Sequence, residues 1–489
     1  MIKPPYILAF LISIFAVMLG IMTLFPNKEI TITNSFSLKF PSINSFFSKK
    51  EIKHTDISEI ININTEAPED SIDSSKNDTL TTIIKIDTLE KKPKIQELEY
   101  NEKGKALLFN FFTKIKKNKK VAHILHYGDS QIEGDRITSY LRNKLQKYYG
   151  GTGNGLVQAH KLAESFSINQ EILGQWYRYN IFGRRDSTVN HRSYGAMGTF
   201  CRFAPTNAYE TGNIFESSVL FTRSKIAYQK DRYYSRMKLF YGNTKEPILA
   251  EVTVDGKQTN FEKLEIGTNV KVKTWYFKKS PKSVKIKFTG SDSPDIYGIS
   301  FEGNSGLVVD NIPMRGASGT NFTSLNYNNF KSMFNKLNVK MVILEYGGNI
   351  VPFIKSNKGI KNYGRAFALQ LKLFKRLNPT IPIIVIGPAD MSKKVDGEFV
   401  TYPMLEALIE EMKAQTLKKD YIFWDMYSAM GGENSMPEWV KNTPALAAGD
   451  YIHFTTKGAR IIAEKFYESI IKVQNEYDYV NKNNIEYDL

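Results

Sequence analysis

Two short polar motifs, one early in the chain and one near its end, carry residue types that could perform acyl transfer together. The first is GDS, which ends at Ser130, and the second is DYIH, which begins at Asp450 and ends at His453. Acyl transfer requires a nucleophile, a base that takes its proton and a group that orients the base. Ser130, His453 and Asp450 suit these three tasks in that order, so we expect them to form one catalytic group.

Acyl transfer also requires hydrogen-bond donors for the negative oxygen that forms on the attacked carbonyl. Two glycine-rich stretches between the motifs could supply them: RGASG, which ends at Gly319, and YGGN, which ends at Asn349. We expect the backbone amides of Ser130 and Gly319 and the side chain of Asn349 to form this oxyanion hole.

The GDS tripeptide also has a plainer interpretation. Asp and Ser both favour the position just before a helix, where their side chains cap the first unbonded amides. The tripeptide alone does not separate a helix cap from a nucleophile. The DYIH motif favours the nucleophile, because it supplies a base and an orienting group that a cap does not need.

The elements around the motifs predict how these residues meet. Residues 121–130 read VAHILHYGDS, an apolar run of strand character, and the helix-like RITSYLRNKLQKYY begins soon after. After residue 305, apolar strands alternate with helices of ten or more residues, which is typical of a parallel sheet with helices on both faces. Such sheets bind ligands at the carboxyl ends of their strands. GDS, RGASG and YGGN each follow a predicted strand, so we expect them at that edge.

Residues 161–304 have a different pattern. Short alternating runs, such as ILAEVTVDGKQ and KSVKIKFTG, are separated by turn residues, which predicts antiparallel strands packed as a β-sandwich. This insert is rich in aromatic and cationic side chains, which stack on sugar rings and attract acidic polymers. The alternative is that its aromatics are core residues and its cations a solvated surface. The insert residues that we expect to contact substrate are Trp176, Tyr177, Arg184, Arg185 and Arg192.

The N-terminal part of the chain predicts a membrane anchor and a tether. Residues 7–25 carry no charge and approach the length that spans a hydrocarbon core. A cleaved signal peptide is the alternative, but the apolar stretch is long for one and no small-x-small cleavage site follows it. We expect a single-pass anchor in residues 1–27 and, because few apolar residues follow, a disordered tether in residues 28–98.

The remaining residues form the head. We expect a discontinuous α/β domain in residues 99–160 and 305–478, interrupted by the insert, and a frayed tail in residues 479–489.

Composition narrows the possible partners. The chain has 489 residues and a formal net charge of +16, which suits a nucleic acid, a membrane surface or an acidic polymer. A head anchored outside the cytoplasm excludes nucleic acid, which leaves the membrane at the N-terminal helix and an acidic polymer. The single cysteine, Cys201, supplies neither a disulfide framework nor a metal cluster. We expect no metal and no cofactor.

The four motifs together resemble the SGNH (GDSL) hydrolase superfamily, which is named after four sequence blocks. Here the blocks read GDSQ with Ser130, RGASG with Gly319, YGGN with Asn349, and DYIH with Asp450 and His453. The resemblance implies a flavodoxin-like three-layer α/β/α fold with the insert between the first two blocks. It also implies a carboxylic ester hydrolase with the residue roles given above.

The third block departs from the pattern of many members. They have an aspartate after the asparagine, whereas Ile350 follows Asn349 here. The oxyanion donor is present, so the departure leaves activity possible, but substrate specificity does not carry over from members that have the aspartate.

A narrower resemblance is to bacterial peptidoglycan O-acetylesterases. The N-terminal anchor, the β-insert at this place and the stretch FWDMYSAMGG before the last block carry it. It implies a jelly-roll-like carbohydrate-binding insert, an inner-membrane location with the head in the periplasm, and removal of acetyl groups from muramic acid. Two alternatives stay open: an SGNH-type O-acetyltransferase of cell-wall or exported polysaccharide, and a non-catalytic glycan-binding protein.

Overall fold

The computed structural model describes residues 4–24, 30–33, 36–38, 55–63, 65–68, 95–117 and 119–483, which divide into one unit up to residue 53 and one from residue 54. In the N-terminal unit, helix α1 (Pro4–Leu24) precedes an antiparallel pair of short strands, β1 (Ile30–Thr33) and β2 (Phe36–Leu38). Within α1, Pro4–Thr23 has a mean hydropathy of 2.4 and is long enough to cross a membrane, a property that signal sequences share.

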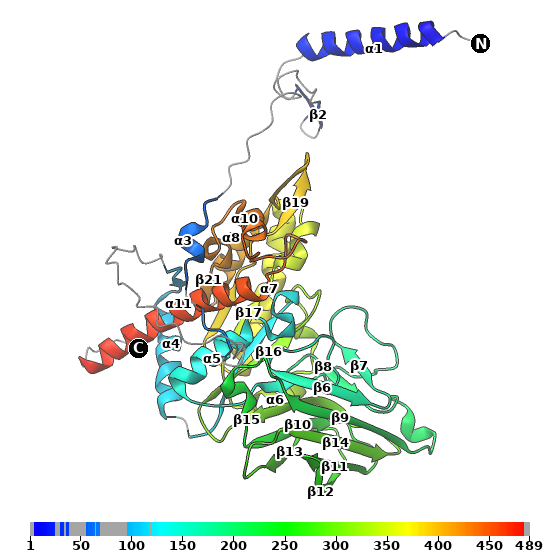
Figure 1. Ribbon diagram of the computed structural model, residues 1–489, viewed down its shortest axis with the longest axis vertical. Helices are drawn as coiled ribbons and strands as arrows, with labels where there is room; N and C mark the ends of the chain where they lie inside the picture. Colours follow the sequence, from blue (N-terminus) through cyan, green and yellow to red (C-terminus); the bar gives the residue numbers. More distant parts are fainter. Residues whose placement is uncertain are drawn as a thin grey trace, which may run out of the picture. The chain divides into compact units, whose positions relative to one another are not determined.

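A six-stranded sheet forms the centre of the second unit (Figure 1). In spatial order its strands are β16 (Leu307–Pro313), β4 (Ala122–Gly128), β17 (Val339–Glu345), β18 (Ile383–Ile386), β21 (Ile422–Trp424) and β3 (Leu98–Glu99). The first five are parallel, and β3 adds an antiparallel edge. If the five parallel strands are numbered by their order in the chain, their spatial order is 2-1-3-4-5. This is a doubly wound order, and its switch point lies between β4 and β17.

Helices cover both faces of this sheet, as the sequence pattern predicted. One face packs against α4 (Glu102–Lys117), α5 (Thr138–Tyr149) and α11 (Thr456–Lys482), and the other against α6 (Tyr327–Lys336), α7 (Asn357–Leu377) and α8 (Leu405–Leu417). Neighbouring residues of β4 show the alternation, since Ile124 joins the first core and Leu125 the second. Helix α11 extends through residues 479–482, which the sequence analysis assigned to a frayed tail.

Short elements complete this part of the fold. They are η2 (Ser130–Asp135), η5 (Phe322–Ser324), η6 (Gly348–Phe353), the hairpin β19 (Ser392–Val395) and β20 (Glu398–Thr401), α9 (Met426–Ala429) and α10 (Ser435–Lys441).

The insert consists of two antiparallel sheets packed around a core of their own. One contains β13 (Lys271–Tyr276), β10 (Arg236–Gly242), β15 (Asp295–Glu302), β8 (Thr199–Arg202) and β7 (Tyr177–Asn180), with β5 (Gly155–Val157) paired to β15. The other contains β12 (Lys257–Leu264), β11 (Ile248–Val254), β14 (Ser283–Gly290), β9 (Phe215–Arg223) and β6 (Ile168–Leu173). Two 3₁₀ turns, η3 (Ala208–Glu210) and η4 (Gln229–Arg232), lie in its loops. Because β5 belongs to this sheet, the insert begins near residue 155 rather than at 161.

Part of the expected tether packs on the head instead. Residues 55–63 and 65–68 include the short helix α3 (Ser58–Ile61), and Ile57 is buried in the core beneath α11. Thr55 Oγ1 donates a hydrogen bond to the Glu433 carbonyl at 2.7 Å, and Glu66 pairs with Lys147 at 2.5 Å. The expectation of disorder is wrong for these residues, because a few apolar and acidic side chains find partners that only the folded head provides. Residues 39–54, 64 and 69–94 lie outside the described residues.

A buried charge cluster joins the insert to the central sheet. His123 on β4 lies 2.7 Å through Nδ1 from Asp310 of β16 and 2.7 Å through Nε2 from Glu302 of β15. Arg236 and Lys238 of β10 also pair with Glu302. Burial alone lowers the pKa of His123, but the two carboxylates outweigh burial and raise its pKa to about 9. We infer that this imidazole carries a proton in the folded protein at neutral pH.

We expect the free energy of unfolding to fall as the pH rises from 6.5 to about 9. The folded pKa of His123 lies above its ordinary 6.5, so its proton stabilises the fold fully below pH 6.5 and this contribution is lost as the pH rises through 9. Denaturant unfolding across this range measures it. His123→Gln should flatten the profile and, because it leaves the buried Asp310 carboxylate without its paired cation, lower stability at pH 6 by roughly 3–5 kcal/mol. An equally steep profile in the variant would show that His123 does not cause the pH dependence of unfolding.

Candidate active site

The catalytic residues expected from the sequence meet at the carboxyl edge of the central sheet. Ser130 follows β4 at the start of η2, and Asp450 and His453 lie in the loop before α11. Ser130 Oγ is 2.8 Å from His453 Nε2, and His453 Nδ1 is 2.7 Å from Asp450 Oδ2. Asn349 follows β17, the neighbour of β4 across the switch point of the sheet, where this fold class binds ligands. A hydroxyl, an imidazole and a carboxylate in this order allow the histidine to take the serine proton.

Asp450 is held as a carboxylate that faces His453. Its Oδ1 accepts hydrogen bonds from the backbone amides of Ile452 and His453, both at 3.0 Å. Partial burial raises the pKa of Asp450, but the hydrogen bonds from the His453 side chain and from these amides outweigh burial and hold the pKa below its ordinary value. A negative charge here stabilises the imidazolium that forms when His453 takes a proton.

The turn that presents Ser130 depends on its two preceding residues. Asp129 Oδ1 accepts a hydrogen bond from the Gln131 amide at 2.9 Å and so caps η2. A Cβ on Gly128 would lie 2.9 Å from an isoleucine side chain and 3.2 Å from the Glu345 backbone oxygen, so glycine permits this close approach of β4 and β17. The cap interpretation of GDS is correct for Asp129, while Ser130 faces the base.

Two side chains without a role in the sequence analysis connect the catalytic segments. Gln131 donates through Nε2 to the Ile452 carbonyl at 2.7 Å, and its Oε1 accepts from the Phe454 amide at 3.3 Å. Arg136 donates to the carbonyls of Ser130 at 2.8 Å and Phe454 at 3.1 Å. Both side chains therefore hold the turn of Ser130 against the segment that carries His453. Gln131 is the last letter of GDSQ, but only these contacts between distant segments reveal what it does.

The side chain of Asn349 is oriented by the other two blocks at the sheet edge. Its Nδ2 lies 3.1 Å from Asp129 Oδ2 and 3.1 Å from the Ala317 carbonyl of the RGASG stretch. Burial raises the pKa of Asp129 to about 7, although the hydrogen bond from the Gln131 amide acts to lower it. Both Nδ2 hydrogens have acceptors in this structure, and the expected role of Asn349 as an oxyanion donor stays a prediction.

Packing explains which residue types occupy positions 319 and 350. Gly319 has a φ of 77°, and a Cβ there would lie 2.6 Å from the Tyr346 ring, so both conformation and space require glycine. The structure brings its loop to Asn349 through Ala317, while the donor role of the Gly319 amide stays a prediction. Ile350, which stands where many members of the superfamily have aspartate, packs against the apolar core on the α7 side.

A cavity of about 190 Å³ opens beside Ser130 and His453. Phe353, Met391 and other apolar side chains form most of its wall, and Asn349 adds a polar group. Phe353 is 74% exposed, which places an aromatic surface at the mouth. Within the described part of the chain, no group of three or more His, Cys, Asp or Glu side chains could hold a metal ion.

The structure removes one of the expected substrate contacts in the insert. Trp176 is 8% exposed, and its ring packs edge-on against Phe288 in the core between the two sheets. Its expected role is wrong, and the alternative that the insert's aromatics are core residues holds here. Tyr177, the next residue, is half-buried and packs against the core that the insert shares with the α7 face of the central sheet.

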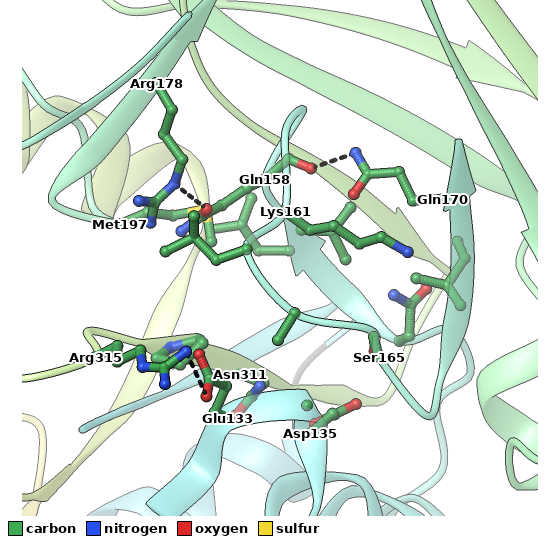
Figure 2. Close-up of a pocket in the computed structure, with 18 of the residues that line it drawn as sticks. Glu133, Asp135, Gln158, Lys161, Ser165, Gln170, Arg178, Met197, Asn311 and Arg315 are labelled. Carbon is green, nitrogen blue, oxygen red and sulfur yellow. Dashed lines mark hydrogen bonds and ion pairs between the residues drawn. The ribbon is translucent and has the colours of Figure 1, made fainter. Parts of the chain in front are cut away.

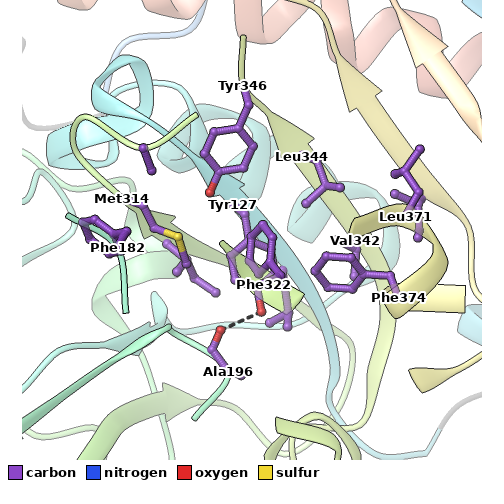
Figure 3. Packing of buried hydrophobic residues seen from close by; sticks show 14 of the residues in the cluster. Tyr127, Phe182, Ala196, Met314, Phe322, Val342, Leu344, Tyr346, Leu371 and Phe374 are labelled. Atoms are coloured by element: carbon purple, nitrogen blue, oxygen red, sulfur yellow. Dashed lines mark hydrogen bonds between the residues drawn. The ribbon is translucent and has the colours of Figure 1, made fainter. Parts of the chain in front are cut away.

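The three arginines of the expected cluster differ in their surroundings. They lie in the loop between β7 and β8, which packs on the hydrolase part through Phe182 and through Ala196, whose carbonyl accepts from Tyr127 at 2.7 Å (Figure 3). Arg185 donates to carbonyls of its own loop, so it stabilises the loop conformation. Arg184 and Arg192 are exposed, and their contact with substrate stays a prediction.

Comparison with solved structures fits this geometry. A structure described as a peptidoglycan O-acetylesterase in action superposes with a TM-score of 0.59 at 21% identity, over 77% of this chain and 99% of that one. This likeness shows that the head shares the fold of that structure. A family two carbohydrate esterase from Clostridium thermocellum matches with a TM-score of 0.24 at 10% identity, over 62% of this chain and 100% of that one. A salicylyl-acyltransferase from a tetracycline biosynthetic pathway matches with a TM-score of 0.28 at 12% identity, over 62% of this chain and 98% of that one. No protein-family model and no curated protein matches the chain.

Proposed function

We propose that the protein is a serine esterase that removes O-acetyl groups from a cell-envelope polysaccharide, with peptidoglycan as its substrate. The observation that carries this proposal is the continuous contact from Ser130 through His453 to Asp450 at the switch point of the sheet. The fold match to a peptidoglycan O-acetylesterase supports the choice of polysaccharide. Helix α1 anchors the head to the membrane in this proposal, and the head faces the periplasm.

The mechanism follows from the geometry in two halves. Ser130 Oγ attacks the acetyl carbonyl while His453 Nε2 takes its proton, and Asn349 and the backbone amides of Ser130 and Gly319 stabilise the oxyanion. His453 then protonates the departing sugar oxygen, which leaves an acetyl ester on Ser130. In the second half His453 takes a proton from water, the water attacks that ester, and acetate departs as the proton returns to Ser130.

We expect the full-length protein in detergent to release acetate from O-acetylated peptidoglycan, because the sugar ester reaches Ser130 through the cavity described above. Enzymatic quantification of acetate, set against the ester lost from the glycan, measures the reaction. Peptidoglycan de-O-acetylated by mild base is the control and should yield no acetate. Ester loss matched by acetylation of an added glycan would identify an O-acetyltransferase, and an unchanged ester content would contradict both activities.

A further inference from the structure

A second cavity, of about 80 Å³, lies where the hydrolase part meets the insert (Figure 2). Glu133 and Arg315 line it from the hydrolase side, and Gln158, Lys161 and Arg178 line it from the insert side. Glu133 follows Ser130 in η2, and Arg315 is the first residue of the RGASG stretch. The cavity therefore adjoins two of the segments that build the active site.

Most charged groups of this cavity have a partner of opposite charge. Arg142 donates two hydrogen bonds to the Asp135 carboxylate, at 2.9 and 3.0 Å. Arg315 lies 3.7 Å from Glu133, and Lys161 Nζ pairs with a glutamate three residues later at 2.6 Å. In each pair the positive and negative charges cancel, so these pairs leave no excess charge for a ligand.

Arg178 is the exception. Its Nε donates to the neutral side-chain oxygen of Gln158 at 2.8 Å, and in the described parts of the chain no ion pair joins it to an Asp or Glu. Gln158 is fixed in turn, because Gln170 donates to its backbone carbonyl at 2.9 Å. Figure 2 shows the Arg178 guanidinium held against Gln158 at the cavity wall, with Gln170 on the far side of Gln158. The guanidinium is thus pre-oriented, and no described residue accepts a hydrogen bond from its two terminal NH₂ groups.

The burial and charge of Arg178 also affect pKa values at this site. Burial lowers the pKa of Arg178, and burial followed by the charge of Arg178 lowers the pKa of the nearby His160. A cation that is partly withdrawn from water without a carboxylate costs free energy, which a bound anion would offset. The planar guanidinium fork matches the oxygens of a carboxylate or a phosphate.

We propose that this cavity is a subsite for an anionic group of the polysaccharide, a carboxylate or a phosphate, which binds the Arg178 guanidinium while Gln158 holds that side chain in place. The subsite rests on the proposed esterase function, since it places an acidic sugar beside the segments that flank Ser130. It assigns the insert the task of selecting a charged glycan by one oriented cation rather than by exposed aromatics.

Titration calorimetry of the full-length protein in detergent tests this subsite with three monosaccharides. N-acetylmuramic acid carries a carboxylate, N-acetylglucosamine 6-phosphate carries a phosphate and N-acetylglucosamine is neutral. We expect at least one anionic sugar to bind about tenfold or more tightly than the neutral sugar, as charge-assisted hydrogen bonds allow. The preferred anion then identifies whether a carboxylate or a phosphate is the natural group.

Two variants and a matched control sharpen the test. Gln158→Glu keeps the size of the side chain and places a carboxylate against Arg178, so it should lower affinity for the preferred anion about tenfold, as should Arg178→Gln. Lys263→Gln removes one exposed charge elsewhere in the insert and should change nothing. If Arg178→Gln does not fold, Gln158→Glu decides.

Equal binding of all three sugars by the wild type, or unchanged anion affinity in Gln158→Glu, would overturn the subsite. Turnover of p-nitrophenyl acetate by the wild type judges the esterase function separately. A protein that hydrolyses this ester but ignores the charge of the sugar retains the function and loses the subsite. One that binds the anion without hydrolysing the ester retains the subsite and loses the function.

Discussion

Ser130→Ala and His453→Ala are each expected to lower ester turnover by roughly 10³-fold or more. The hydroxyl and the imidazole nitrogen are 2.8 Å apart, so removal of either partner eliminates the proton transfer that generates the nucleophile. Because the two residues act as one unit, the double variant should be about as slow as either single variant. Hydrolysis of p-nitrophenyl acetate by the full-length protein measures all three.

A matched control separates this effect from general loss of structure. Ser187→Ala removes a hydroxyl from an exposed loop position of the insert and should leave turnover unchanged. Ser130 and His453 lie at the sheet edge, outside the main apolar cores, so we expect the two alanine variants to unfold at the wild-type midpoint. Wild-type turnover in either folded variant would remove Ser130 and His453 from the mechanism.

Asn349→Ala is expected to lower turnover by about 10²–10³, the usual cost of removing one oxyanion donor. The side-chain amide is held between Asp129 and Ala317, so it is oriented before substrate arrives. The loss should occur mainly in kcat, since an oxyanion forms only in the transition state. Steady-state kinetics with p-nitrophenyl acetate separates kcat from KM.

Ile350→Asp serves as the neighbouring control for this prediction. Ile350 packs against apolar side chains and does not line the catalytic cavity, so its replacement should act on stability more than on kcat. A larger loss of kcat in folded Ile350→Asp than in Asn349→Ala would show that the third block works differently here.

The five parallel strands of the central sheet could be predicted because they are mostly buried on both faces and alternate with long helices. The insert's strands β9, β10, β11, β13, β14 and β15 were recognisable as short runs between turn residues, and β14 alternates strictly between buried and half-buried residues. By contrast, β5, β7 and β8 have only three or four residues each, and the partners of β5 and β6 are β15 and β9, which lie far along the chain. A strand of this kind is specified by the partner that bonds to it, which no local pattern records.

The sequence by itself determined which residues meet at the sheet edge. GDS, YGGN and DYIH each follow or precede a regular element, and a parallel sheet brings its strand ends to one edge, so residue type and element order sufficed for Ser130, Asn349 and His453. Only the tertiary structure decided which side chains position them and which insert residues face a cavity. Gln131 acts through backbone groups far along the chain, and Trp176 is buried by a strand of the opposite sheet. Arg178 donates to a neutral glutamine, and no carboxylate among the described residues pairs with it. Burial and charge compensation depend on distances between segments that are remote in sequence, and those distances arise only when the chain folds.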